Sequence, residues 1–452
     1  MTASGPAGPP EDHGRSEPIR VAEPTTTFDD VDFFTDTSII DDPYPYFDFL
    51  RETRGPVWIE PVYGVAVVTG HEESMEVYRD PQLYSSCNSP TGPFPGLPVT
   101  PDGDDADPVV EQYRDQLPMS EFMVTMDPPR HGEYRKLLTG LFTPNRLKEN
   151  EAFMWRLADE QLDRFLANGK CEFVSEYGGP FAGLVIADLL GVPEEDMRRF
   201  REGFEAAASF VVEENPSSVQ GNPLEFIEGA FHEYIEDRRR QPRADILTHL
   251  AQVKFSDGTE PDVATLAREA AFVFAAGQET TVRLMAFAMC YLAEHPEVQD
   301  KLRHDRELIP GFVEEMLRME SPIKCHFRLT RRRTTLGGVE LPAGTTVMLL
   351  PGAANRDPRH FASPHAVVLD RMNVREQLAF GRGAHSCLGQ PLARAETRVT
   401  LERVFDRMAN IDISSEKHGP PGARRYEYLP TFIFRGLNTI YLTFDEISTQ
   451  DA

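Results

Sequence analysis

The residue best placed for chemistry in this sequence is Cys387, within the run Phe380-Gly381-Arg382-Gly383-Ala384-His385-Ser386-Cys387-Leu388-Gly389. The glycines let backbone approach a bulky group and adopt angles that other residues resist. A helix is predicted over 391–408, and its free N–H groups and positive dipole end stabilise a thiolate. One cysteine cannot build a zinc or iron–sulfur site. It can serve as a thiolate ligand of a haem iron, whose equatorial ligands come from the porphyrin, and the alternative is a buried structural cysteine, which is the commoner case for a single cysteine.

The second chemical feature is an acid beside a hydroxyl, Glu279 and Thr280, in a long apolar run. The run predicts a helix over 261–294, about 50 Å long at about 1.5 Å per residue, with an apolar centre on every face. Ala276 and Gly277 would leave room for a ligand beside this helix. Thr280 would bond back to a carbonyl one turn earlier or open the helix locally. A helix with one solvated polar turn is the alternative.

Two further pairs share helix faces. His131 and Arg135 are four residues apart in a helix that follows Asp127-Pro128-Pro129, and Glu315 and Arg318 are three apart in a helix over 312–319. Side chains at these spacings lie side by side. The alternative for the first pair is a solvated basic face. For the second the alternative is a surface ion pair, which contributes about 0.2–0.5 kcal/mol.

The elements that must position these residues are mostly helices. Residues 129–299 are helical in pattern, with breaks at glycines and prolines, whereas residues 90–107 are rich in Pro, Gly and Asp and predict a mobile loop. Short strands are predicted at 57–60, 65–69, 329–339 and 346–350, with a helix at 43–51 and a closing hairpin near 430–444. The sequence therefore predicts one mainly α domain with small β-sheets over 29–446, between a disordered lead-in (1–28) and a C-terminal tail (447–452).

Composition narrows the class of protein. The 452 residues are 40% hydrophobic and 26% charged, which is typical of a globular protein with a substantial core. The net charge of −27 argues against nucleic-acid partners and anionic membranes. Five scattered cysteines without a C-x-x-C pair indicate a reducing cytoplasm. No membrane anchor is expected, because residues 1–28 contain no long apolar segment.

The motifs together resemble those of the cytochrome P450 family. The Cys387 run resembles the haem signature F-G-x-G-x-H-x-C-x-G at every fixed position. The segment around Glu279 and Thr280 resembles the oxygen-activating motif A/G-G-x-D/E-T-T. The D-P-P-x-H-x-x-x-R and E-x-x-R patterns are also met, and the resemblance runs in family order from about residue 41 to residue 444.

The resemblance implies a single-domain cytochrome P450 fold with haem b (iron-protoporphyrin IX) between the long central helix and the cysteine loop. Cys387 would be the axial metal ligand, Glu279 and Thr280 would relay protons, and Arg356 would complete the E-x-x-R group. The remaining residues implied at the cofactor are His131, Arg135, Arg328 and His385 at the propionates, with Phe380, Gly381, Ala276 and Gly277.

The resemblance also outlines a substrate pocket. Its walls would come from residues 90–123, from Phe272, Val273 and Ala276, from 323–327 and from 431–433, with a lid from the helices flanking 215–222. These segments are mainly apolar and indicate a hydrophobic substrate. Cys325 and His326 are polar exceptions without an assigned role.

The implied function is a monooxygenase that inserts one atom of O2 into a small-to-medium hydrophobic molecule, by hydroxylation or epoxidation of a terpenoid, steroid or fatty-acid-like substrate. Electrons would come from a separate ferredoxin and ferredoxin reductase, which would dock near Arg130, Lys136, Arg382 and Arg398. We expect a cytoplasmic monomer. The alternatives are a peroxygenase, which tends to lack the acid–threonine pair, and a non-catalytic haem binder or gas sensor, which needs no proton relay.

Overall fold

The computed structural model describes residues 28–193, 196–198, 200 and 225–447. Residues 1–27 of the expected lead-in, nearly all of the C-terminal tail and the segment 215–222 of the expected lid lie outside the described residues.

Helices dominate the described chain. They are α1 (Tyr44–Arg54), α2 (His71–Arg79), α3 (Asp107–Tyr113), α4 (Arg130–Thr139), α5 (Pro144–Leu162), α6 (Gly179–Leu190), α8 (Glu225–Arg240), α9 (Ile246–Ala251), α10 (Val263–Glu294), α11 (Pro296–His304), α12 (Ile309–Met319), α13 (Pro351–Ala354), α14 (Gln390–Arg407) and α15 (Ser415–His418). The strands are β1 (Val57–Ile59), β2 (Ala66–Val68), β3 (Tyr84–Ser85), β4 (Lys170–Glu172), β5 (His326–Thr330), β6 (Thr334–Leu336), β7 (Val339–Leu341), β8 (Thr346–Leu349), β9 (Met408–Ile413) and β10 (Tyr441–Glu446).

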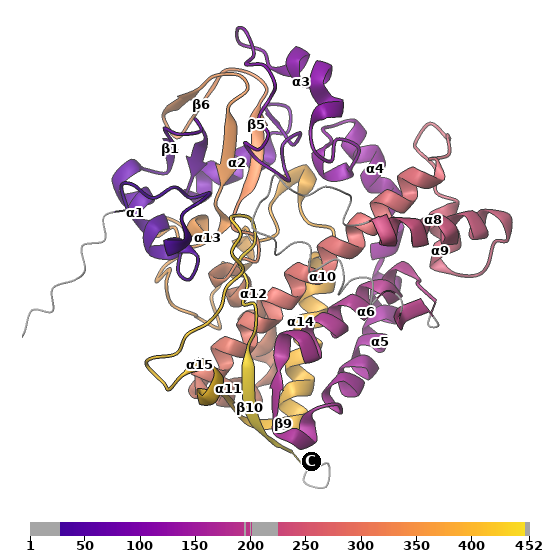
Figure 1. Ribbon diagram of the computed structural model, residues 1–452, viewed down its shortest axis with the longest axis vertical. Helices are drawn as coiled ribbons and strands as arrows, with labels where there is room; N and C mark the ends of the chain where they lie inside the picture. The colour runs from indigo at the N-terminus through magenta and orange to yellow at the C-terminus, as the bar shows by residue number, and fades with distance from the viewer. Residues whose placement is uncertain (1–27, 194–195, 199, 201–224, 448–452) are drawn as a thin grey trace, which may run out of the picture.

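Helix α10 is the axis of the molecule. It crosses the centre of Figure 1, and it packs against α6, α8 and α14. Its start is fixed by Asp262, whose carboxylate accepts a hydrogen bond from the N–H of Thr265 at 2.6 Å. The predicted start at Pro261 is therefore two residues early. The buried centre agrees with the prediction of an apolar helix that runs through the interior.

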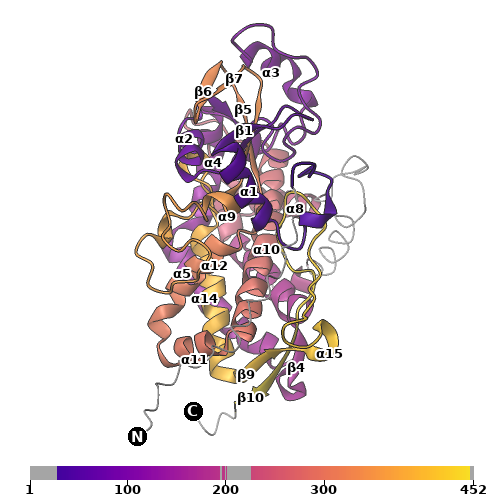
Figure 2. The same ribbon diagram turned by 90° about the vertical axis from the view of Figure 1, so that its left-hand side faces the viewer.

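The strands form two main sheets at opposite ends of the molecule. A five-stranded sheet has the order β1-β2-β8-β5-β3, and a three-stranded sheet has the order β4-β10-β9. In Figure 2, β1 and β5 lie at the upper end, whereas β4, β9 and β10 lie at the lower end. Helices α10 and α14 pack against β9 of the three-stranded sheet.

Two strand predictions are wrong in detail. The single strand expected over 329–339 is divided: β5 pairs with β8, and β6 pairs with β7 in a separate hairpin. The hairpin expected near 430–444 is reduced to an isolated bridge between Tyr428 and Leu437. Strand β10 instead pairs with β4 and β9. These partners lie far away in the sequence, so local patterning did not indicate them.

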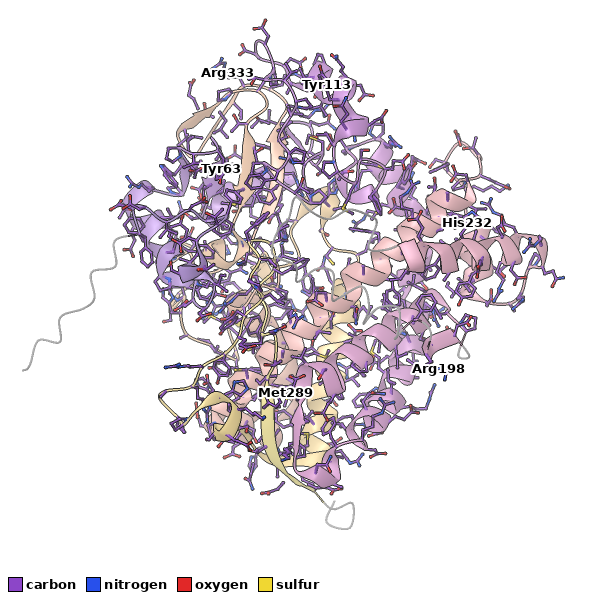
Figure 3. The ribbon with its side chains drawn as sticks, in the orientation of Figure 1. Tyr63, Tyr113, Arg198, His232, Met289 and Arg333 are labelled. Atoms are coloured by element: carbon purple, nitrogen blue, oxygen red, sulfur yellow. The ribbon has the colours of Figure 1, made fainter. Side chains whose placement is uncertain are left out.

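The Asp-rich segment before α3 is held by ion pairs to the turn that follows β5. The pairs are Asp107 with Arg331 at 2.7 Å, Asp105 with Arg332 at 2.7 Å and Asp104 with Arg333 at 2.6 Å. Figure 3 shows Arg333 and Tyr113, at the end of α3, together at the top of the molecule. The segment has no helix or strand before α3, as predicted.

None of the described helices combines the length and apolarity needed to cross a lipid bilayer.

Candidate active site

The Cys387 loop is shaped by a backbone hydrogen bond and by glycines in the left-handed conformation. The N–H of Cys387 donates to the carbonyl of Phe380 at 2.9 Å. Gly381 has a φ of 60° and Gly383 a φ of 72°. A Cβ on Gly383 would lie 2.0 Å from the carbonyl oxygen of Tyr78, so the loop touches the backbone of α2. Only glycine fits at this contact.

Cys387 differs from the other cysteines in its surroundings. Its side chain has exposed surface, whereas the other four are buried: Cys87, Cys171, Cys290 and Cys325. Burial is nevertheless the main influence on its thiol and raises its pKa, so the exposed surface lies within the protein. The N–H groups of Gly389 and Gln390 and the guanidinium of Arg135 act in the opposite direction and favour the thiolate. The thiol therefore lines an enclosed space and has thiolate-stabilising neighbours.

Phe380 joins this loop to the helical core. The guanidinium of Arg394, on α14, lies 4.7 Å from the centre of the Phe380 ring. The same guanidinium donates to the Glu314 carboxylate of α12 at 2.5 Å. The loop is thus held between α12 and α14.

The centre of α10 has one exposed position. Ala276 is exposed, although it lies between the buried residues Phe274 and Gln278 of a central helix. Gly277 faces elsewhere: a Cβ built there would lie 3.2 Å from Ile186 of α6. On its Cβ side Gly277 therefore admits a neighbouring helix, whereas Ala276 has exposed surface. That these two residues make room for a ligand stays a prediction.

Thr280 follows Ala276 by one turn. Its hydroxyl donates to the carbonyl of Ala276 at 2.9 Å, as predicted for a threonine in this position. Thr281 makes the equivalent bond to Gly277 at 2.9 Å, but its side chain is buried. The two hydroxyls therefore face different surroundings.

Glu279 is held by an ion pair. Its Oε1 accepts from Nε of Arg283 at 2.8 Å and also from Nη2 of the same side chain. Arg283 donates in addition to the carbonyl of Leu437. Oε2 of Glu279 makes no hydrogen bond to any residue of the described chain.

Four predicted basic residues meet beside the Cys387 loop. The rings of His131 and His385 have centres 3.8 Å apart. Arg135 donates to the carbonyl of Ser386 at 2.7 Å. Arg328 is buried on β5. Three separate segments, α4, β5 and the cysteine loop, supply these groups.

No carboxylate of the described residues forms an ion pair with this basic group, and Asp127 acts on Arg328 only from beyond ion-pair distance. Burial, followed by the neighbouring positive charges, lowers the pKa of His131 to about 4 and that of His385 to about 2. Neither Arg135 nor Arg328 takes part in a described ion pair, and the buried Nε2 atom of the half-buried His385 lacks a hydrogen-bond partner. Buried cations normally have anionic partners. The donor set therefore fits the two propionates of a haem.

The E-x-x-R pair forms, but with a different third member from the one predicted. Glu315 and Arg318 are fully buried and lie 2.7 Å apart. The third guanidinium is that of Arg371, which donates to Glu315 at 2.8 Å. Arg356 instead donates to the Met319 carbonyl at 2.6 Å, and its guanidinium lies 3.3 Å from the centre of the Tyr44 ring. The assignment of Arg356 to this group is wrong.

Cys325 and His326 both have structural partners. The hydroxyl of Tyr78 lies 2.6 Å from Nδ1 of His326. The thiol of Cys325 lies 3.4 Å from the carbonyl oxygen of Phe432. His326 therefore contacts α2, and Cys325 contacts the 431–433 segment expected in the pocket wall.

The expected docking patch is largely neutralised. Lys136 pairs with Glu133 at 2.8 Å, and Arg398 pairs with both Glu151 and Glu402. Arg382 donates to backbone carbonyls. Arg130 lies over the Tyr134 ring at 5.4 Å from its centre. The four residues do not form a uniform surface of free positive charge.

Several buried ionisable groups were missed from the sequence, and three of them are Glu269, Glu396 and Lys324. Glu269, on α10, accepts from the N–H of Met123 at 2.8 Å, and burial raises its pKa to about 7. Burial raises the pKa of Glu396, on α14, well above its usual value, and Thr281 is its neighbour. Lys324 is also buried. For Glu269 the sequence signal was a charged residue beside the apolar run of α10, whereas Glu396 has charged and polar neighbours in the sequence and gave no signal.

Comparisons with known proteins identify the family. The family model described as Cytochrome P450 matches residues 184–409. Cytochrome P450 144 of Mycobacterium tuberculosis is 31% identical over 398 residues, covering 86% of this chain and 88% of the relative. The monooxygenase PikC of Streptomyces venezuelae is 31% identical over 405 residues, covering 88% and 90%.

The fold agrees with this result. The solved structure of substrate-free CYP150A6 from Mycobacterium marinum is 54% identical, with a TM-score of 0.88, and covers 93% of this chain and 100% of that one. The chain belongs to the cytochrome P450 family, whose members bind haem b. It is accordingly a haem-dependent monooxygenase.

Proposed function

We propose that the protein inserts one oxygen atom from O2 into a small-to-medium hydrophobic substrate, with Cys387 as the axial iron ligand in a haem domain over residues 29–446. The observation that carries the proposal is the arrangement on α10, where exposed Ala276 precedes the Thr280 hydroxyl by one turn. An enclosed helix surface with a single hydroxyl suits proton transfer to a bound diatomic molecule.

Residues of the protein stabilise the negative charges of the axial thiolate and of the haem propionates. Haem b, when bound, supplies the activation of dioxygen. Cys387 binds as a thiolate, which the N–H groups of Gly389 and Gln390 stabilise. The basic group described above neutralises the two propionates, so that the buried cations and the carboxylates compensate each other. Phe380, Gly381 and Ala276 complete the walls of the haem site.

Glu279 and Thr280 move protons in this proposal. Oε2 of Glu279 takes a proton from solvent, while Arg283 fixes Oε1. The Thr280 hydroxyl rotates away from the Ala276 carbonyl and passes a proton towards the site. Thr281 has no part in the relay, because its side chain is buried on another face of the helix.

The names of relatives support a hydrophobic substrate. A relative from Pseudonocardia autotrophica, 30% identical, is named Vitamin D(3) 25-hydroxylase. A structure of CYP109E1 from Bacillus megaterium, 27% identical, is a complex with corticosterone. We infer a terpenoid, steroid or fatty-acid-like substrate, hydroxylated or epoxidised with electrons from a separate ferredoxin and ferredoxin reductase in the cytoplasm.

The decisive experiment compares Thr280→Ala with Thr281→Ala. Product formed and peroxide released are measured per reductant consumed, with a substrate that gives a full spectral shift. Thr280→Ala is expected to keep haem content and reductant consumption but to release peroxide in place of product. Thr281→Ala is expected to remain close to the parent.

Two results would overturn the proposal. If Thr280→Ala forms as much product per reductant consumed as the parent, Thr280 is excluded from the proton relay. The reduced parent under carbon monoxide should show the strongly red-shifted Soret band of thiolate ligation. If this band is absent, Cys387 is excluded as the iron ligand. Cys387→His is expected to abolish that band.

A further inference from the structure

His326 is the first residue of strand β5, and its ring lies against the Cys387 loop. The strand runs from His326 to Thr330, and side chains two residues apart in a strand share one face. His326 and Arg328 therefore lie on the same face of β5. A Cβ built on Gly381 would lie 3.9 Å from Cε1 of the His326 ring, so this ring meets the cysteine loop.

The electrostatic neighbours of His326 place it beside the basic group of the Cys387 loop. Burial lowers the pKa of His326 to about 3, and the positive charge of Arg328 acts in the same direction. After burial, Arg328 is also among the charges that lower the pKa of His131 and of His385. One guanidinium thus acts on all three rings. His326 is a neutral imidazole at physiological pH and belongs to this group.

The side chain of His326 borders an enclosed space. It is half-buried, whereas its neighbours Cys325 and Phe327 are buried. Burial is nevertheless the main cause of its lowered pKa, so the surface that it exposes lies inside the protein. The same relation holds for Cys387. Both side chains therefore border interior space beside the cysteine loop.

A hydrogen bond to Tyr78 determines which nitrogen of His326 carries the proton. The Tyr78 hydroxyl lies 2.6 Å from Nδ1 of His326, and it has no other hydrogen-bond partner in the described parts of the chain. A proton on Nδ1 would leave the hydroxyl hydrogen without an acceptor. The hydroxyl therefore donates to Nδ1, and the neutral ring carries its proton on Nε2. This Nε2–H makes no hydrogen bond to any residue that the structure describes.

We propose that Nε2–H of His326 donates a hydrogen bond to a haem propionate, and that Tyr78 is the positioning residue that fixes this tautomer. Arg135 and Arg328 already balance the charges of two carboxylates, so a neutral donor adds a hydrogen bond without excess positive charge. A bond from N–H to a carboxylate is charge-assisted and is stronger than a neutral one. The inference rests on the proposed propionate site, to which it adds one residue.

Two substitutions separate the nitrogens of His326. His326→Asn keeps an acceptor near the position of Nδ1 for the Tyr78 hydroxyl but has no donor at the position of Nε2. His326→Gln places an N–H donor near that position. Each variant is loaded with haem or with haem dimethyl ester, whose carboxylates are blocked, and transfer of the cofactor to excess apomyoglobin is followed at the Soret band.

The parent should release the ester faster than haem. The ratio of the two rates should fall about 10-fold in His326→Asn, because a hydrogen bond to a charged group is lost, and should stay within about 3-fold of the parent in His326→Gln. The control is His304→Asn, an exposed histidine of α11 whose Nδ1 also has a single partner, and its ratio should equal that of the parent.

Resonance Raman spectra of the haem-loaded proteins provide a second measurement. The propionate bending band should shift in His326→Asn and in Tyr78→Phe, since the latter frees Nδ1 and releases the tautomer. The band should not shift in His304→Asn. If His326→Asn folds poorly, the spectrum of Tyr78→Phe decides the question, and an unshifted band there would overturn the inference.

Equal rate ratios in His326→Asn and the parent would also overturn the inference, as would equal losses in His326→Asn and His326→Gln. A parent that releases haem and the ester at the same rate would exclude the whole propionate site, and His326 with it. Failure of His326 alone would leave the parent ratio and the effect of Arg328→Leu in place. Failure of the proposed monooxygenase function would register separately, in the coupling of Thr280→Ala.

Discussion

Glu279 and Arg283 form an ion pair one turn apart on α10, and Arg283 also donates to the carbonyl of Leu437. The acid proposed for the relay is thus fixed by a side chain that is itself tied to the C-terminal part of the chain. Arg283 donates to Oε1, and Oε2 has no hydrogen-bond partner within the described chain. The pair positions the acid without occupying both of its oxygens.

Replacing Glu279 by glutamine should separate its contact with Arg283 from its proposed role in proton transfer. The amide of Glu279→Gln keeps an oxygen for Arg283 but cannot relay a proton, so product formation should fall roughly 10²-fold while haem content stays normal. The solvent isotope effect on turnover should rise, because proton delivery becomes slower. Glu279→Asp keeps an acid and should recover most of the activity. Equal turnover in the glutamine variant and the parent would exclude the acid from the relay.

Removal of one propionate contact should reduce the preference of the protein for haem over haem dimethyl ester. The unmutated protein should bind haem in preference to its dimethyl ester, whose carboxylates are blocked. Arg328→Leu should reduce this preference about 10- to 100-fold, since a hydrogen bond to a charged group contributes about 1.5–3 kcal/mol. Affinities are measured by titrating the apoprotein and following the Soret band.

The matched control is Arg332→Leu, which removes an exposed guanidinium from the adjacent turn. Its preference for haem over the ester should equal that of the parent. An unchanged preference in Arg328→Leu would place the propionates elsewhere.

Sequence patterns predicted the features that depend on near neighbours. The Cys387 loop and the apolar centre of α10 are local, so a run of residues suffices to indicate them. The space beside Gly277 depends on how α6 packs, and the sequence did not show that Ile186 fills it.

The arginine that joins Glu315 and Arg318 is a second feature that the sequence did not predict. Arg356 and Arg371 both lie in irregular chain before the cysteine loop, and spacing does not decide which one turns back to α12. The structure gives the contact to Arg371, at 2.8 Å. Tertiary packing, which the sequence pattern does not specify, makes this choice.

Double-mutant cycles should confirm this partner. Glu315→Ala should lower the free energy of unfolding by about 3–5 kcal/mol, because it leaves buried Arg318 without its carboxylate. The coupling energy between Glu315→Ala and Arg371→Ala should be about 0.5–3 kcal/mol, whereas that between Glu315→Ala and Arg356→Ala should be near zero. Denaturant unfolding of the haem-loaded variants provides the measurement. A larger coupling to Arg356 would restore the assignment made from the sequence.

Glu269 should give the stability of the protein a distinct pH dependence. Burial raises its pKa in the folded protein to about 7, against an ordinary value of 4.5, although the N–H of Met123 and the charges of Arg268 and Arg130 oppose the shift. The folded state therefore binds this proton more tightly than the unfolded state. The stability contributed by Glu269 is complete below pH 4.5 and is lost as the pH rises through about 7.

Glu269→Gln removes this titration, so its stability relative to the parent should increase between about pH 5 and about pH 8. The difference between the two unfolding free energies, measured in denaturant at each pH, isolates Glu269 from the other titrating groups. Glu52→Gln, at an exposed position on α1, serves as the control and should show a constant difference. A constant difference for Glu269→Gln as well would mean that Glu269 is ionised throughout this range. The hydrogen bond from the N–H of Met123 would then join a carboxylate of α10 to the segment before α4 at every pH in this range.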